Sequence, residues 1–253
     1  MKLFLGLATV VVLLAGLGGC ASHSEINPVL DPDALFKVIQ ENPERFMAAL
    51  QDASEIAERL TQERTMEALF EAPLTAKMQD WRAIDGDVDA PITIFMYTDF
   101  QCPYCARGYQ TMQQVKALYG SKVRFVLKHL PLDFHDSAMS AATIFEAINM
   151  QSSIEAYQWH NIVFENQAGL NTPDYGVSWM LEMAGAVGAD VDRVMSDMGS
   201  KSIEARIAAD LDEAARLNFS GTPGFLINGI PLNGAYPIDA FASIIDRHLS
   251  NID

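Results

Sequence analysis

The chain has 253 residues, of which 49% are hydrophobic and 20% are charged, a composition typical of a globular protein and not of a disordered one. Its net charge of −16 argues against nucleic acid as a partner, because a phosphate backbone would be repelled. The three cysteines separate by position: Cys20 ends an apolar leader, whereas Cys102 and Cys105 form a pair. The folded part therefore carries one dithiol and no disulfide framework.

The N-terminus is typical of a secretory leader. A basic start is followed by an apolar run, residues 3–17, which is short for a membrane span and ends in small residues. Residues 17–20, Leu-Gly-Gly-Cys, resemble a bacterial lipobox, in which the cysteine is lipidated; the alternative is an ordinary signal peptide with an incidental cysteine. We expect a lipoprotein signal peptide over 1–19, lipid attachment at Cys20 and a tether over 20–32. In bacterial lipoproteins of this kind, an Asp directly after the lipidated cysteine marks retention in the inner membrane. Ala21 stands at that position, so the lipobox resemblance implies sorting to the outer membrane.

An amphipathic helical segment is expected next, over residues 33–73. Asp31 or Asp33 can cap a first helix through about Gln40, and Asn42-Pro43 favours a second helix start. An apolar stripe at helical spacing follows, formed by Phe46, Leu50, Ala53, Ala57 and Leu60. The stripe either packs on its own domain or pairs with another subunit. We favour the second possibility, a homo-oligomer formed through residues 33–72.

The remaining pattern predicts an α/β domain over residues 83–250. An acidic turn, residues 83–91, leads into a strand at 92–96, a helix at 106–119 and a strand at 123–129. This order implies a parallel pair with a right-handed crossover. A helical insertion over about 137–217 follows, and then two short strands near 224–232 and a last helix over about 238–249.

Residues 102–105, Cys-Pro-Tyr-Cys, stand at the first strand–helix junction. Unpaired N–H groups and the positive end of the helix dipole stabilise a thiolate there, and Pro103 suits the first helical turn. Tyr104 is neutral, so the helix terminus must lower the pKa of Cys102 without a neighbouring imidazolium. We expect Cys102 to be an exposed nucleophile and Cys105 its buried resolving partner.

This order, with Cys-x-x-Cys at the junction and Thr222-Pro223 before the third strand, resembles the thioredoxin fold. The helical insertion makes the chain similar to DsbA-like envelope thiol–disulfide oxidoreductases, and Cys-Pro-Tyr-Cys with Thr-Pro also resembles the DsbG/DsbC subset and Com1-type lipoproteins. The resemblance implies that Pro223 is the family's cis-proline and that Thr222 and Pro223 hold an extended substrate. One departure is Met96, which stands where many members carry a buried acid that helps deprotonate the resolving thiol, so a water or another group must take that role.

Three readings of the dithiol remain at this point. The preferred one is an envelope thiol–disulfide oxidoreductase that exchanges disulfides with protein substrates, has no organic cofactor and no metal, and depends on a membrane redox partner. A second is a non-catalytic envelope scaffold with a structural disulfide, and a third is a metal carrier, for which two thiolates would need further ligands. The histidines available for that purpose are expected to be structural; they are His129, His135 and His160. Asp99 is expected to cap the active-site turn without a catalytic role.

Overall fold

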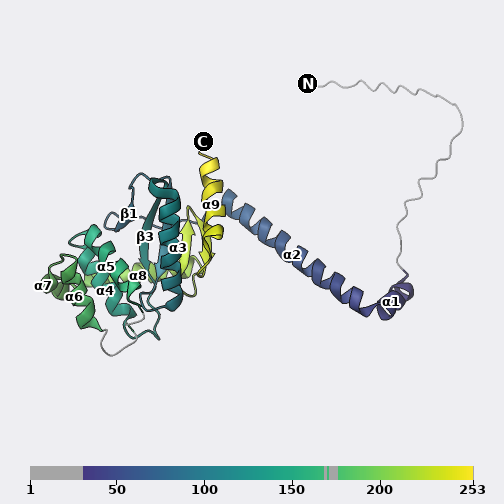
Figure 1. Ribbon diagram of the computed structural model, residues 1–253, viewed down its shortest axis with the longest axis horizontal. Helices are drawn as coiled ribbons and strands as arrows, with labels where there is room; N and C mark the ends of the chain where they lie inside the picture. The colour runs from purple at the N-terminus through teal and green to yellow at the C-terminus, as the bar shows by residue number, and fades with distance from the viewer. Residues whose placement is uncertain (1–30, 168–169, 171–175, 253) are drawn as a thin grey trace, which may run out of the picture. The chain divides into compact units, whose positions relative to one another are not determined.

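The computed structural model of the chain describes residues 31–167, 170 and 176–252 (Figure 1). The expected signal peptide, the lipid attachment at Cys20 and most of the tether lie outside the described residues. The chain divides into two compact units, residues 1–58 and residues 59–253. Over the described residues, no helix is both long enough and apolar enough to cross a membrane.

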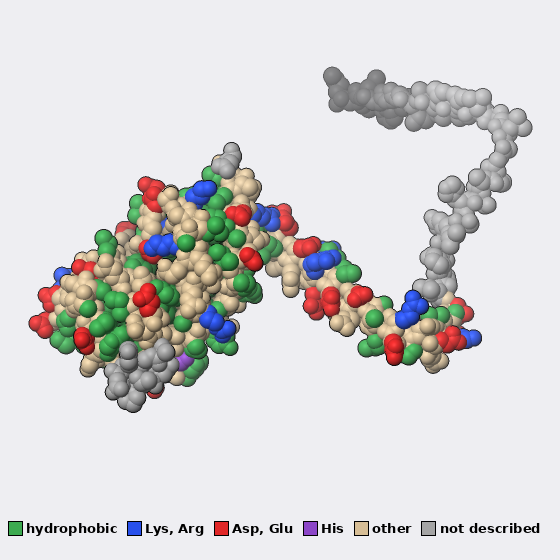
Figure 2. All heavy atoms as spheres, in the orientation of Figure 1, with side chains coloured by type: hydrophobic (Ala, Val, Ile, Leu, Met, Phe, Trp, Pro, Cys, Tyr) green, Lys and Arg blue, Asp and Glu red, His purple; other side chains and the backbone are tan. Residues whose placement is uncertain are grey.

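The two helices expected in the N-terminal segment are present. Helix α1 (Pro32–Glu41) is capped by Asp31, whose side chain accepts a hydrogen bond from the Asp33 N–H, and α2 (Pro43–Glu71) begins at the predicted Pro43. No residue of α2 is buried, and Leu50 and Leu60 on the predicted stripe are 48% and 42% exposed. Figure 2 shows acidic and basic side chains interspersed along this helix. Leu50 and Leu60 of the stripe are therefore exposed among the described residues.

The second unit contains a five-stranded sheet in the order β1-β3-β2-β4-β5. Its strands are β1 (Ile84–Gly86), β2 (Ile92–Thr98), β3 (Val123–His129), β4 (Gly224–Ile227) and β5 (Ile230–Asn233). Strands β2 and β3 are parallel, as expected, whereas β1 pairs antiparallel with β3 and β4 pairs antiparallel with both β2 and β5. The prediction of a turn over residues 83–91 was wrong for residues 84–86, which form β1. Residues 84–86 extend the sheet because the exposed edge of β3 offers them hydrogen-bond partners.

The helices follow the predicted order, and the helix predicted over 106–119 begins three residues earlier, at Pro103. They are α3 (Pro103–Tyr119), η1 (Gly120–Lys122), α4 (Ala138–Asn149), α5 (Ser153–Glu165), α6 (Val177–Ala186), α7 (Val191–Asp197), α8 (Lys201–Arg216) and α9 (Ile238–Ser250). Helices α3 and α9 lie side by side and contribute to one hydrophobic core with one face of β2 (Figure 1). Helix α8 covers the other face, where Phe95, Tyr97 and Val126 form a second core.

Period-two alternation along the strands explains the two cores. In β2, Ile92, Ile94 and Met96 face the core with α3 and α9, whereas Phe95 and Tyr97 face α8. Both faces are covered, so the strand reads as a continuous apolar run. Its carboxyl end delivers the Cys-Pro-Tyr-Cys motif to the start of α3.

Candidate active site

The two cysteines lie at the N-terminus of α3. Cys102 is the N-cap residue with extended backbone, and Pro103 occupies the first helical position, as the sequence predicts. The Cys105 N–H donates to the Cys102 carbonyl at 3.0 Å, which closes the first turn. Both side chains are unpaired thiols in the structure. The motif therefore has the strand–helix geometry in which a first-turn thiol meets unpaired N–H groups.

The expected exposure of Cys102 was wrong. Cys102 is 4% exposed and Cys105 is 2% exposed, whereas Tyr104 between them is 53% exposed. Segments distant in sequence cover Cys102: its Sγ lies 3.6 Å from the Thr222 carbonyl oxygen, and the Gln167 side chain donates to the Cys102 carbonyl at 2.6 Å. Because both contacts are long-range, nothing in the local sequence indicated them.

The environment shifts the pKa values of the two thiols in opposite directions. A hydrogen bond from Cys105 lowers the pKa of Cys102 to about 5, against the opposing effect of burial, and hydrogen bonds from the Thr222 side chain and from the backbone N–H groups of Cys105 and Tyr104 add to it. Burial, followed by the neighbouring Cys102, raises the pKa of Cys105 well above its ordinary value. The lowered pKa of Cys102 agrees in direction with the sequence prediction. This arrangement favours one thiolate and one thiol.

Thr222 and Pro223 lie against the dithiol. Their peptide bond is cis, as the resemblance implies, and the Pro223 carbonyl accepts from the Gly234 N–H at 2.8 Å. A hollow of about 210 Å³ lies beside them, lined by residues 220–223 and 233–234.

Asp99 caps the turn before Cys102, as expected: its Oδ1 accepts from the Gln101 N–H at 2.7 Å. Its Oδ2 contacts His135 Nδ1 at 2.7 Å, a pairing that the sequence reasoning did not identify. The sequence also gave no indication of Gln167, whose side chain donates to the carbonyls of both Phe100 and Cys102. Polar residues far apart in the chain carry no local signal of such pairing.

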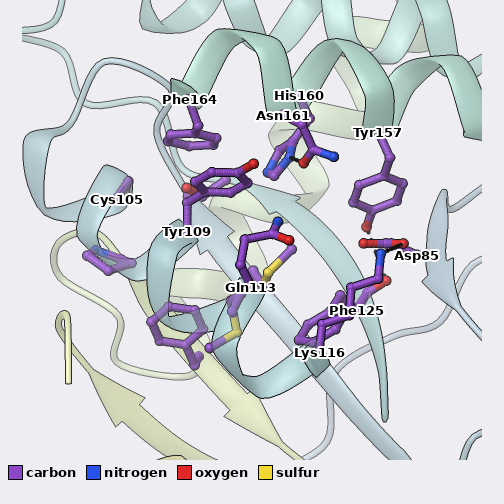
Figure 3. Close-up of a pocket in the computed structure, with 15 residues that line it drawn as sticks. Asp85, Cys105, Tyr109, Gln113, Lys116, Phe125, Tyr157, His160, Asn161 and Phe164 are labelled. Atoms are coloured by element: carbon purple, nitrogen blue, oxygen red, sulfur yellow. Dashed lines mark hydrogen bonds and ion pairs between the residues drawn. The ribbon is translucent and has the colours of Figure 1, made fainter. Parts of the chain in front are cut away.

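A cavity of about 30 Å³ lies behind Cys105 (Figure 3). Met96 and Thr98 of β2 line it, together with aromatic and polar side chains from α3 and α5. Lys116 and Asp85, which also line it, form an ion pair at 2.6 Å. Because a water needs roughly 10–15 Å³ of such space, the cavity has room for one or two waters next to the buried thiol. That space lies beside Met96, the position at which the family resemblance implies a water or another group in place of a buried acid.

His160 also lines the cavity, and burial lowers its pKa to about 4, so its imidazole is neutral near pH 7. His129 contacts Glu146 at 3.1 Å in the core. Within the described residues, no cluster of three or more His, Cys, Asp or Glu side chains is placed to hold a metal ion. His129 thus lies in the core beside Glu146, and His160 lies in the core beside the cavity that Cys105 also lines.

Comparison with known proteins identifies the family. A family model described as Thioredoxin matches residues 79–247, more than half of the chain. The chain belongs to the thioredoxin family. Among curated relatives, Na(+)/H(+) antiporter NhaA 3 of Salinispora tropica is 33% identical over 163 residues, which are 64% of this chain and 24% of that protein. Antiporter NhaA 1 of Salinispora arenicola is 31% identical with the same coverage. This thioredoxin-family chain thus spans about a quarter of the length of the curated relatives it matches.

Solved structures show the same fold. A thioredoxin-like oxidoreductase from Silicibacter pomeroyi DSS-3 has a TM-score of 0.60 at 23% identity and covers 68% of this chain and 94% of its own. Alpha-DsbA1 of Wolbachia pipientis has a TM-score of 0.60 at 19% identity, with 70% and 96% covered. A periplasmic thioredoxin-like protein from Salmonella enterica serovar Typhimurium has a TM-score of 0.57 at 19% identity, with 69% and 99% covered. The predicted α/β thioredoxin fold with a DsbA-like helical insertion is confirmed.

Proposed function

We propose that this thioredoxin-family protein is a thiol–disulfide oxidoreductase of the bacterial envelope that acts on protein substrates through Cys102 and Cys105. The observation that carries the proposal is the position of both thiols at the N-terminus of α3, where their pKa values shift in opposite directions. A low pKa provides a thiolate nucleophile near neutral pH, and a high pKa keeps its partner protonated until it is needed. Family membership and the DsbA-like fold support the same reaction class.

In the reductive direction the Cys102 thiolate attacks a substrate disulfide, forms a mixed disulfide and releases one substrate thiolate. The Cys105 thiol then loses its proton and attacks Cys102 Sγ, so that the Cys102–Cys105 disulfide forms and the second substrate thiolate leaves and is protonated. The substrate is reduced by two electrons and the dithiol is oxidised by two. The same steps reversed oxidise a substrate dithiol, so the direction depends on the reduction potential.

Thr222 and Pro223 would hold the substrate beside Cys102. The Thr222 carbonyl faces Cys102 Sγ at 3.6 Å, so an extended peptide that pairs with this backbone would bring its own sulfur to the nucleophile. The hollow lined by residues 220–223 and 233–234 provides space for substrate side chains. Pro103 and the exposed Tyr104 would modulate the reaction at the motif itself.

The cellular context belongs to the same proposal. The leader and the lipobox-like residues before Cys20 support lipid attachment at the outer membrane, facing the periplasm or the surface. The exposed stripe of α2 supports self-association through residues 33–72. A dithiol that turns over needs a membrane redox partner to restore it.

The test is the reduction potential of the Cys102–Cys105 pair, measured on the full chain in glutathione buffers. We expect an equilibrium between dithiol and disulfide, with a potential between about −270 and −120 mV, the range of this fold. The Cys105→Ser variant should accumulate a mixed disulfide at Cys102, because the resolving thiol is gone. The Cys102→Ser variant is the matched control and should accumulate none.

The measurement also separates the alternatives. A disulfide that does not exchange with glutathione would contradict the enzyme and support the non-catalytic scaffold. Tight binding of zinc or copper(I) by the reduced chain, without exchange, would support the metal carrier.

A further inference from the structure

Asp99 is a wholly buried carboxylate three residues before the nucleophile. Its side chain has 0% exposure and receives three hydrogen-bond donors. Two are backbone groups, the Gln101 N–H at 2.7 Å and the Leu132 N–H at 2.9 Å. The third is the His135 ring, whose Nδ1 lies 2.7 Å from Asp99 Oδ2. An imidazole that pairs with a carboxylate oxygen carries a proton on that nitrogen, so His135 is the donor.

The backbone of the same residue contacts both cysteines. The Asp99 N–H donates to Cys105 Sγ at 3.4 Å, and the Asp99 carbonyl accepts from the Cys102 N–H at 3.2 Å. The position of Asp99 therefore affects one sulfur directly and the start of the motif through its backbone.

His135 fastens this turn to a second loop. Its side chain is 16% exposed and packs against the Phe134 ring at 4.6 Å between centroids. Close by in the chain, the Ser137 N–H donates to the Gln101 side chain at 2.8 Å. The segment that precedes α4 is thus joined to the active-site turn by side chains from both sides.

A buried negative charge near a thiol raises the pKa of that thiol. A like charge disfavours the thiolate, and donors that saturate the carboxylate reduce that effect. Of the three donors to Asp99, His135 is the side chain, so it can be removed without changing the backbone. Other ionisable groups on or beside this turn are the two cysteines and, on the loop of His135, the exposed Asp133 and Asp136.

We propose that His135 and Asp99 are a positioning pair for the dithiol. The His135 Nδ1–H fixes the residue whose backbone contacts both cysteines, and it offsets the buried charge of a carboxylate three residues before Cys102. Neither residue touches the substrate in this role. The inference deepens the proposed function, on which it rests, because it assigns the stability of the nucleophile to a pair outside the Cys-x-x-Cys motif.

The test compares His135→Leu with His135→Asn in the full chain. The two replacements are similar in size, but only Asn offers an N–H to Asp99. The readout is the rate of Cys102 alkylation as a function of pH, located by mass spectrometry. We expect Leu to raise the midpoint by about one unit or more and Asn to stay near the parent chain. In a fixed glutathione buffer, the Leu variant should also hold a larger fraction of disulfide, because its reduced form loses thiolate stabilisation.

Asp136→Asn is the matched control, since it removes an exposed charge from the same loop and should leave the midpoint unchanged. If the Leu variant does not fold, His135→Ala replaces it as the variant without a donor. The proposal is overturned if the non-donating variant keeps the parent midpoint, even with lower stability, or if Asn shifts it as much as Leu does. Alkylation requires no disulfide exchange, so a chain that shows the expected midpoints but does not equilibrate with glutathione would refute only the proposed function.

Discussion

Cys102 and Cys105 lie three positions apart, and their surroundings shift their pKa values in opposite directions. Cys102 accepts hydrogen bonds from the first turn of α3 and from Cys105, whereas Cys105 is enclosed by the core beneath the helix. The difference is one of environment alone, since the side chains are chemically identical. Because the fold gives the two thiols different pKa values, the fold determines that Cys102 attacks first and Cys105 second in the proposed reaction.

The lowered pKa of Cys102 makes the stability of the reduced chain depend on pH. The pKa of Cys102 is about 5 in the folded chain and about 8.5 in an unfolded one. Because the folded value is the lower one, the thiolate stabilises the reduced fold fully above the unfolded pKa, less at lower pH, and not at all below about pH 5. The thermal unfolding midpoint of the reduced chain should therefore rise between pH 5 and pH 8 by more than that of Cys102→Ser.

Subtracting the Cys102→Ser profile removes the contributions of other groups, such as His160, whose pKa is about 4. Equal slopes for the two chains over this interval would show that the Cys102 thiolate contributes nothing to folding.

At the scale of elements, a cluster of buried charges holds α8 to the sheet. Lys128 of β3 is 0% exposed and lies 2.7 Å from Glu213 and 3.6 Å from Asp210, both on α8. Asp210 also pairs with the buried Arg82, and the Tyr97 hydroxyl donates to Glu213 at 2.8 Å. Burial lowers the pKa of Lys128 against the pull of these carboxylates. The cluster lies on the face of the sheet opposite α3 and α9.

The Lys128→Met substitution tests this cluster. It keeps an apolar stem of similar length but leaves two buried carboxylates short of a partner, so we expect a loss of about 3–5 kcal/mol of unfolding free energy in urea titrations. Arg193→Met is the control, because Arg193 is 53% exposed and pairs with Asp197 at 3.5 Å on the surface of α7. That change should cost less than about 1 kcal/mol. Similar losses in the two variants would contradict the account of the buried cluster.

At the scale of the whole molecule, the apolar stripe of α2 is an exposed hydrophobic surface. Leu50 and Leu60 are exposed, and so is Ile56 at 48% on the same helix. Toward its C-terminal end, Met66, Leu69 and Phe70 pack against the core of the second unit, and Arg247 of α9 pairs with Glu67 at 2.6 Å. These contacts lie in the part of the helix that belongs to the second unit, whereas Leu50 and Ile56, in the first unit, are exposed among the described residues.

Self-association would cover that stripe. We expect the chain to sediment as an oligomer in analytical ultracentrifugation, and the double substitution Leu50→Glu with Leu60→Glu to yield monomers, because charges in an apolar interface are costly to bury. Ser54→Glu with Gln62→Glu adds the same charge elsewhere on the helix and should leave the oligomer intact. A parent chain that sediments as a monomer would contradict self-association through residues 33–72.

Much of this protein could be predicted from its sequence, because the deciding signals are local. The Pro43 helix start, the apolar run of β2 and the Cys-x-x-Cys motif each depend on neighbouring residues, and the order of elements follows from their periodicity. Together with Thr222-Pro223, these features pointed to the thioredoxin fold. Strand β1 was missed because three residues at a sheet edge show too little periodicity to differ from a turn.

The tertiary structure alone decided which distant groups meet. Burial of Cys102 depends on Gln167 and Thr222, and the Asp99–His135 pair joins residues 36 positions apart. Lys128 lies in an otherwise largely apolar strand, and its partners on α8 lie more than eighty positions away. The physical reason is that hydrogen bonds and ion pairs act over a few ångströms, whereas the chain that brings these groups together is folded by apolar contacts spread over its length.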